Sequence, residues 1–155
     1  MVDLSKDDRV IFLGQSVACA GTFMSTTLTE VPLEKRIELP VAEEMQMGMS
    51  IGMSLAGFIP ISIFPRWNFL LLAANQIVNH LDVLQAKVII RVGIGSETPL
   101  YPGQQHVGNF SEAFRLMLKK TPVIELRTPD EVVTEYRKAF LRNGPTIMVE
   151  DANLY

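Results

Sequence analysis

Short apolar runs of strand length recur along this chain, and segments with helix signals separate most of them. The runs are Val10 to Leu13, Ile37 to Leu39, Ile59 to Phe64, Val88 to Val92, Val123 to Leu126 and Thr146 to Val149. Strands that alternate with helices predict an α/β fold, with a mostly parallel sheet and helices on both of its faces. Val88 to Val92 is β-branched and nearly continuous, so we expect this strand to lie in the middle of the sheet.

Two further helices and a long loop are predicted between these runs. Thr128-Pro129-Asp130-Glu131 begins a helix, because threonine can cap it, proline suits its first position and acids favour its positive end. That helix should end at Asn143-Gly144-Pro145. Trp67 to Leu84 indicates another helix, and Gly93 to Asn109, rich in glycine and proline, indicates a long loop of the kind that is often functional.

Composition excludes several classes of protein. A chain of 155 residues fits one domain, which we expect to span residues 1–155, and the net charge of −3 with dispersed lysines and arginines argues against nucleic acid as a partner. Cys19 is the only cysteine, so an internal disulfide is excluded. We find no secretory leader and therefore expect a cytoplasmic location.

Met45 to Pro65 carries no charge and raises the question of a membrane span. Pro60 would interrupt such a helix, and serines dilute its hydrophobicity. The run divides instead into a helix ending near Gly57 and a strand from Phe58 to Phe64, so we expect no membrane-spanning segment.

Glu43 is the best candidate for chemistry. A strand at Arg36 to Leu39 and a turn at Pro40 to Ala42 place Glu43 in the first turn of the next helix, and open α/β sheets bind ligands where strand ends face helix starts. The alternative is a charge that merely favours the positive end of the helix. Glu44 points about 100° away, so only one of the two can face a given pocket, and composition does not choose between them.

Other candidate residues each have a structural alternative. Gly48 and Gly52 lie one turn apart on one helix face, which indicates close approach of another backbone, either in the core or in a partner subunit. Trp67 and Phe69 form an aromatic face near the same edge of the sheet, although core packing is the commoner role of either ring alone. His106 lies in the glycine-rich loop, where it either acts near neutral pH or is solvated and inert. With two histidines and no clustered ligands, we expect no metal site built by this chain.

Pro40-Val41-Ala42-Glu43, followed by Gly48-Met49-Ser50-Ile51-Gly52, resembles the glutamate and G-Φ-x-x-G signature of the pyrimidine-binding domain of thiamine diphosphate enzymes. The likeness is closest to the beta subunit of 2-oxo acid dehydrogenase E1 components, in the transketolase-like superfamily. It continues through Leu13 to Val17, Gly57 to Ile61, Asn75 to Asn79, Gln105-His106, Ser111 to Phe114 and Thr128 to Glu150. The resemblance implies the Pyr type of the thiamin diphosphate-binding fold.

The resemblance also implies roles for three residues, Glu43, Phe69 and His106. It selects Glu43 over Glu44 as the acid that hydrogen-bonds N1′ of the cofactor's aminopyrimidine and thereby assists loss of the proton from thiazolium C2. Phe69 matches the position whose ring stacks on the pyrimidine, and the neighbouring Trp67 is a second cofactor-binding candidate. His106 matches a loop histidine that reaches the substrate or an intermediate.

Two features usual in the family are not found in this sequence. No GDG sequence of the diphosphate and Mg²⁺ site occurs in it, and we expect no C-terminal domain of the kind usual in E1 beta chains. The resemblance therefore implies the small subunit of a split enzyme, completed by a partner chain that binds diphosphate and Mg²⁺ in an α2β2 heterotetramer or similar assembly, with the Gly48/Gly52 helix at a subunit contact. The reaction would be decarboxylation of a 2-oxo acid or transfer of a two-carbon ketol unit between sugars, an oxidoreductase or a transferase activity. The alternatives are a non-catalytic interaction subunit that keeps the fold, and a fragment of a longer polypeptide.

Overall fold

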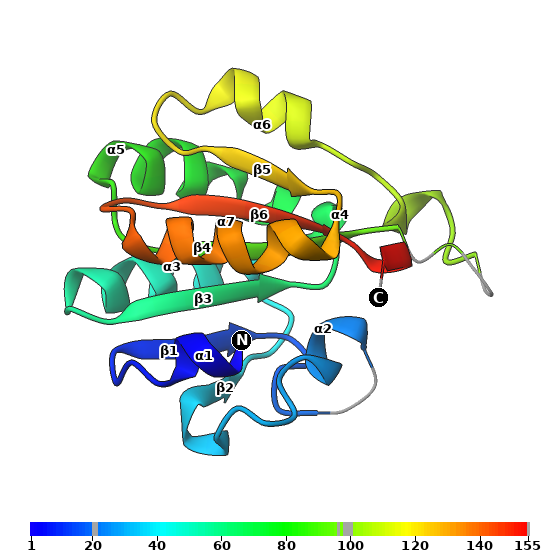
Figure 1. Ribbon diagram of the computed structural model, residues 1–155. Helices are drawn as coiled ribbons and strands as arrows, with labels where there is room; N and C mark the ends of the chain where they lie inside the picture. Colours follow the sequence, from blue (N-terminus) through cyan, green and yellow to red (C-terminus); the bar gives the residue numbers. More distant parts are fainter. Residues whose placement is uncertain (20–21, 96, 98–100, 155) are drawn as a thin grey trace.

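The protein is described here by a computed structural model that covers residues 1–19, 22–95, 97 and 101–154. Within these residues six parallel strands form one sheet in the order β2-β1-β3-β4-β6-β5 (Figure 1). The strands are β1 Val10–Gly14, β2 Arg36–Glu38, β3 Ile59–Phe64, β4 Ile89–Ile94, β5 Val123–Leu126 and β6 Thr146–Asp151. The predicted parallel sheet and the interior position of the strand at Val88 to Val92 are confirmed.

Helices cover both faces of the sheet, which confirms the three-layer α/β class. One face packs against α1 Val2–Ser5, α2 Phe23–Thr26 and α7 Pro129–Leu141. The other packs against α3 Glu43–Leu55, α4 Trp67–Leu70, α5 Asp82–Leu84 and α6 Ser111–Met117 (Figure 1). Side chains of one strand alternate between these layers, because successive strand residues point to opposite faces: Ile89 lies in the α2/α7 cluster, and Ile90 lies in the α3/α4/α6 cluster.

The uncharged run from Met45 to Pro65 divides into the end of helix α3 and strand β3 and does not form a single long helix. The buried positions of α3 are Glu43, Gln46, Met47, Ser50 and Ile51, which form one stripe at helical spacing. The helix ends at Leu55, and Gly57 adopts a φ of +97° before β3 begins at Ile59. No helix in the described part of the chain is long and apolar enough to cross a membrane.

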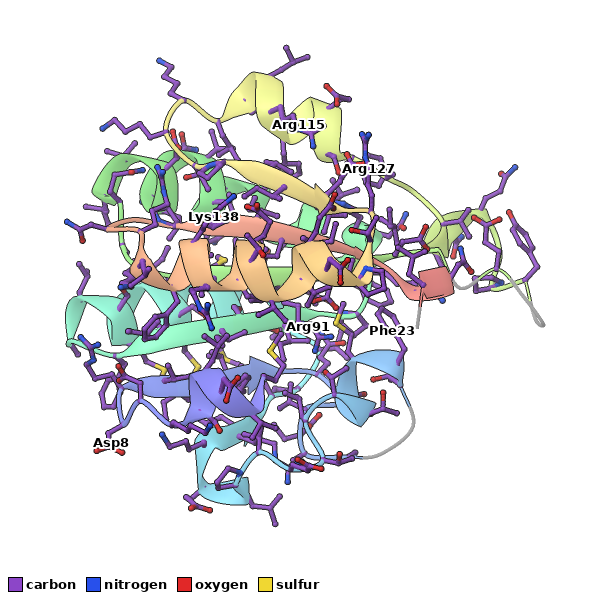
Figure 2. The ribbon with its side chains drawn as sticks, in the orientation of Figure 1. Asp8, Phe23, Arg91, Arg115, Arg127 and Lys138 are labelled. Carbon is purple, nitrogen blue, oxygen red and sulfur yellow. The ribbon has the colours of Figure 1, made fainter. Side chains whose placement is uncertain are left out.

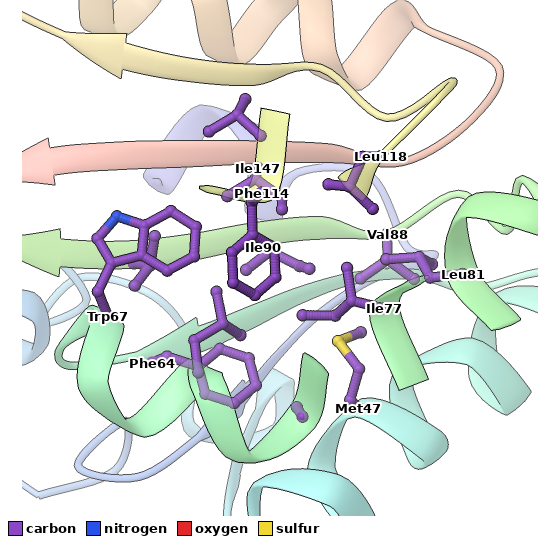
Figure 3. Packing of buried hydrophobic residues seen from close by; sticks show 14 of the residues in the cluster. Met47, Phe64, Trp67, Ile77, Leu81, Val88, Ile90, Phe114, Leu118 and Ile147 are labelled. Carbon is purple, nitrogen blue, oxygen red and sulfur yellow. The ribbon is translucent and has the colours of Figure 1, made fainter. Parts of the chain in front are cut away.

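The helix predicted from Trp67 to Leu84 is confirmed, but it is not a uniform α-helix. The segment passes from α4 into a 3₁₀ turn, η2 Leu71–Ala73, then into a π-helix, η3 Gln76–Leu81, and finally into α5. Ala73, Ile77 and Leu81 recur every four residues and are fully buried. On a regular α-helix, side chains four residues apart point in directions that differ by about 40°. The wider π turn keeps these side chains on the core, and the close view in Figure 3 shows Ile77 and Leu81 in that packing.

The core alternative for Gly48 and Gly52 is excluded, and the subunit contact stays a prediction. Both glycines are exposed, and a Cβ added at either position would meet nothing within 4 Å, so no described backbone packs closely against them. Thr128 stands at the N-cap of α7, but its side chain makes no capping hydrogen bond. The Glu131 carboxylate instead accepts the backbone N–H of Arg127 at 2.8 Å. Helix α7 otherwise ends close to the predicted stop, and Gly144 adopts a φ of +148°.

A buried ion pair joins the middle of the sheet to the helices on the α2/α7 side. Arg91 of β4 and Glu150 of β6 are 0 and 1 % exposed, and Arg91 Nη2 lies 2.6 Å from Glu150 Oε2. Arg91 Nη1 also donates to the carbonyl of Met24 at 3.1 Å, and Tyr136 of α7 donates its hydroxyl to Glu150 Oε1 at 2.6 Å. Figure 2 shows Arg91 near Phe23 of α2, toward the carboxyl end of the strands.

The loop predicted from Gly93 to Asn109 is shorter than expected, because β4 continues to Ile94. Residues 96 and 98–100 of this loop lie outside the described residues. Gln104–His106 forms a 3₁₀ turn, η4, before α6 begins at Ser111.

Candidate functional site

Glu43 lies at the carboxyl edge of the sheet, where the connections of neighbouring strands diverge. The chain leaving β1 returns to β2 on one side, whereas the chain leaving β3 returns to β4 on the other. Such a divergence leaves a crevice at the strand ends, and ligands of open α/β sheets bind in that crevice. Glu43 occupies the first position of α3 at this edge and is only 2 % exposed, while the adjacent Glu44 is exposed.

The two carboxylate oxygens of Glu43 have different surroundings. Gln15, in the turn after β1, donates its side-chain amide Nε2 to Glu43 Oε1 at 3.1 Å. Within the described residues no hydrogen bond reaches Oε2, and Oε2 is not one of the fully buried atoms that lack a partner. Oε2 is therefore the oxygen that has no hydrogen-bond partner among the described residues.

Gln46 fixes the start of α3 against the sheet. Its amide Nε2 donates to Ser62 Oγ at 3.0 Å and to the carbonyl of Ile63 at 2.9 Å, and the residue is fully buried. Gly14 makes this approach possible, since a Cβ there would lie 2.2 Å from the Ile63 oxygen and 3.1 Å from the Gln46 amide. Sequence reasoning missed the roles of Gln15 and Gln46. The available signal was the polar Gln46 three residues after Glu43, on the buried face of an apolar helix.

Phe69 and His106 are brought together, as a pair of ring side chains from segments far apart in the sequence. Their ring centroids are 5.6 Å apart in an edge-on arrangement. Arg66 holds the histidine loop by donating Nη1 to the carbonyls of His106 and Gly95 at 2.8 and 2.9 Å, and Asn68 accepts the Gly108 N–H at 3.1 Å. Both rings are partly exposed. Among the described residues no hydrogen bond joins Glu43 to this pair.

Trp67 does not share this position. Its side chain is fully buried in the core, where the indole packs on Phe114 with ring centroids 4.8 Å apart (Figure 3). The ring has no free face for a cofactor, so the cofactor-binding role expected for Trp67 is corrected to core packing, the alternative considered from the sequence. His80 is exposed near the end of η3.

Two cavities of the described structure lie away from these residues. A cavity of about 260 Å³ lies beside the start of α7, between Leu126, Pro129 and Leu154. A groove of about 450 Å³ separates α1 from α7, between Leu4, Tyr136 and Phe140. Neither is lined by Glu43, Phe69 or His106. Among the described residues no group of three or more His, Cys, Asp and Glu side chains could hold a metal ion.

Comparison with known proteins identifies the class of this domain. The family model described as "Transketolase, pyrimidine binding domain" matches residues 3–155. The chain therefore belongs to the transketolase pyrimidine-binding-domain family, which confirms the resemblance inferred from the sequence.

Particular relatives narrow the comparison. The chain is 34% identical to the pyruvate dehydrogenase E1 component subunit beta of Cyanidium caldarium, over 99% of this chain and 49% of that protein. It is 28% identical to the corresponding subunit of Gracilaria tenuistipitata var. liui, over 99% of this chain and 50% of that protein. The chain thus spans about half the length of these relatives.

Solved structures share the fold. A split-gene transketolase described as an inactive beta4 tetramer superposes with a TM-score of 0.77 at 19% identity, over 97% of this chain and 48% of that one. Transketolase from Campylobacter jejuni superposes with a TM-score of 0.71 at 16% identity, over 94% of this chain and 23% of that one.

Proposed function

We propose that this chain is the small, pyrimidine-binding subunit of a split thiamine diphosphate enzyme, with Glu43 as its catalytic acid. The observation that carries the proposal is the Glu43 carboxylate itself, buried at the carboxyl edge of the sheet with one oxygen held and the other open. A solvated helix charge, the alternative considered from the sequence, does not require such burial.

The residues at this edge fit the aminopyrimidine half of the cofactor. Glu43 Oε2 supplies a carboxylate oxygen able to share a proton with a weakly basic ring nitrogen, in a position largely withdrawn from water. The partly exposed ring of Phe69 supplies an aromatic surface for a heterocycle. When bound, thiamine diphosphate supplies a thiazolium carbon that attacks carbonyl groups once it has lost its proton. His106, held by Arg66 and edge-on to Phe69, would face the substrate side of the site.

A partner chain would complete the site. A solved structure of the same fold is described as a split-gene transketolase, which supports a separate partner chain. We propose that the separate chain binds diphosphate and Mg²⁺, and that the assembly is a heterotetramer of α2β2 type.

The exposed side of α3 is the proposed contact between two copies of this subunit. Met45 and Met49 are 44 and 37 % exposed there, and the space beside Gly48 and Gly52 is open. A glycine-notched, methionine-rich helix face permits close packing by a second subunit.

The reaction belongs to one of two related types. Relatives named as pyruvate dehydrogenase or 3-methyl-2-oxobutanoate dehydrogenase subunits act on 2-oxo acids, and the solved neighbours include transketolases. We propose a 2-oxo acid or a ketose as substrate. The cytoplasmic location stays a prediction, since one relative of this kind, from Bos taurus, is mitochondrial.

Exchange of the C2 proton of thiamine diphosphate with deuterium tests this function. The complex is purified with its co-purifying partner, and exchange is followed by ¹H NMR for the wild type, Glu43→Gln and Glu44→Gln. Glu44 is the matched control because it is an exposed glutamate in the same helical turn. Loss of exchange by about 100-fold or more in Glu43→Gln alone supports the proposal.

Undiminished exchange in Glu43→Gln would contradict it and favour a non-catalytic subunit. An intact mass of the native protein tests the remaining alternative, because a longer native polypeptide would exceed the 17.3 kDa of this chain.

A further inference from the structure

Glu38 holds the turn after β1 in a strained conformation. Ser16 adopts a φ of +56°, a left-handed conformation that costs a non-glycine residue energy. The Glu38 carboxylate, at the end of β2, accepts the backbone N–H groups of Ser16, Val17 and Ala18 at 2.6, 2.8 and 2.8 Å. Charge-assisted hydrogen bonds of this kind offset the strain, and they fix the direction in which the adjacent Gln15 leaves the backbone.

The side chain of Gln15 extends from this turn to Glu43 at the start of α3. Its amide lies 3.1 Å from Glu43 Oε1, across 28 residues of sequence. A side-chain amide N–H is a permanent donor that does not ionise. Glu43 therefore has a fixed donor at one oxygen, and its other oxygen is the one left for a ligand.

This contact is not what attaches α3 to the sheet. Gln46 already does so through Ser62 and the Ile63 carbonyl, from a fully buried position on the same face of the helix. Loss of the Gln15 amide would leave these bonds in place, so its effect should fall on the Glu43 carboxylate and not on the docking of the helix.

We propose that Gln15 is a positioning residue that orients the Glu43 carboxylate, and that Glu38 supports it by holding the turn at residues 15–18. The proposal rests on the function proposed for Glu43, and it adds Gln15 and Glu38 as the residues that orient the Glu43 carboxylate. The donor does not titrate, so orientation is set by a hydrogen bond and not by a proton shared with a second acid.

The contact is measured first in the chain without cofactor or partner. Gln15→Leu, Glu43→Leu and the double variant form a thermodynamic cycle, read by urea unfolding. A hydrogen bond to a charged group predicts a coupling of about tenfold or more in the unfolding constant. Ser16→Gly keeps all three N–H donors and should preserve this coupling, whereas Glu38→Gln should reduce it. Additive effects, within about twofold, would overturn the proposal.

The second measurement uses the assembled complex at saturating thiamine diphosphate. Gln15→Leu should slow C2 proton exchange by about tenfold to 100-fold, while the cofactor concentration for half-saturation changes by less than about threefold, because misorientation affects the reacting group more than binding. Gln15→Glu replaces the hydrogen-bond donor with a second carboxyl group, and two carboxylates placed together repel each other. Its exchange should also fall relative to wild type.

The outcomes separate this inference from the proposed function. Exchange that survives in Glu43→Gln refutes the function itself. Exchange that is lost in Glu43→Gln but unaffected in both Gln15 variants refutes only the positioning role.

Discussion

Replacement of Arg91 by methionine should destabilise the protein more than most single substitutions. Arg91 donates Nε to both oxygens of Glu150 at 2.9 Å and Nη2 to Oε2 at 2.6 Å, and neither side chain is more than 1 % exposed. Its Nη1 also donates to Met24 O and to Thr27 Oγ1, at 3.1 and 2.8 Å. Methionine fills a similar volume but donates none of these bonds.

The expected loss is about 3 to 5 kcal/mol, because a buried carboxylate is left without its cation. Domains of this kind have total stabilities of about 5 to 15 kcal/mol, so the loss is a large share. Adding Glu150→Leu removes the stranded charge, although Tyr136 then loses an acceptor that it now contacts at 2.6 Å. The double variant should therefore be about 1 to 2 kcal/mol more stable than Arg91→Met alone.

Urea unfolding followed by tryptophan fluorescence is a direct assay. Trp67 is the single tryptophan and is fully buried, so its emission reports loss of the core. A cost below about 1 kcal/mol for Arg91→Met, or a double variant no more stable than the single one, would refute the reasoning.

Three further changes test other parts of the fold. Asp82→Ala should cost about 2 to 4 kcal/mol near neutral pH, since the carboxylate accepts three backbone N–H groups and the Thr121 hydroxyl. Burial opposes ionisation of Asp82, but these hydrogen bonds together outweigh it and lower its pKa. The stability it contributes is thus present above the ordinary carboxyl range and is lost as pH falls through the lowered pKa, so the difference between wild type and variant in chemical unfolding should shrink in acid. Gly14→Ala should cost about 2 kcal/mol or more by thermal unfolding, because the added Cβ would lie 2.2 Å from the Ile63 carbonyl oxygen at a φ of +149°; an unchanged melting temperature would contradict this. Gly48→Ala should stabilise the isolated chain by up to about 1 kcal/mol, because the space there is open. Weaker self-association of the same variant in sedimentation would support the proposed α3 contact, and unaltered association would count against it.

Local patterns in the sequence predicted the strands and much of the helix structure. The β-branched run at Val88 to Val92 became the inner strand β4, and the proline and acids after Thr128 mark the start of α7. These signals are local, since strand and helix periods are set by nearby residues. A strand, a turn and a helix start read in order pointed to an acid at the start of α3, but only the family resemblance selected Glu43 over Glu44, and its catalytic role stays a proposal.

Contacts between distant segments were beyond this kind of reasoning. The sequence contains Gln15 and Glu43, but their hydrogen bond depends on β1 lying beside β2 and β3, which no local period specifies. The same holds for Phe69 and His106, which meet only because the loop after β4 folds back on α4.

The sequence by itself determined which segments form strands and helices, and that an acid stands at the start of α3. Tertiary structure decided that Gly48 and Gly52 face open space, that Trp67 fills the core, and that the two oxygens of Glu43 have unequal surroundings. The physical reason is that periodicity shows that a residue is buried or exposed, whereas the packing order of the strands decides which residues lie against it.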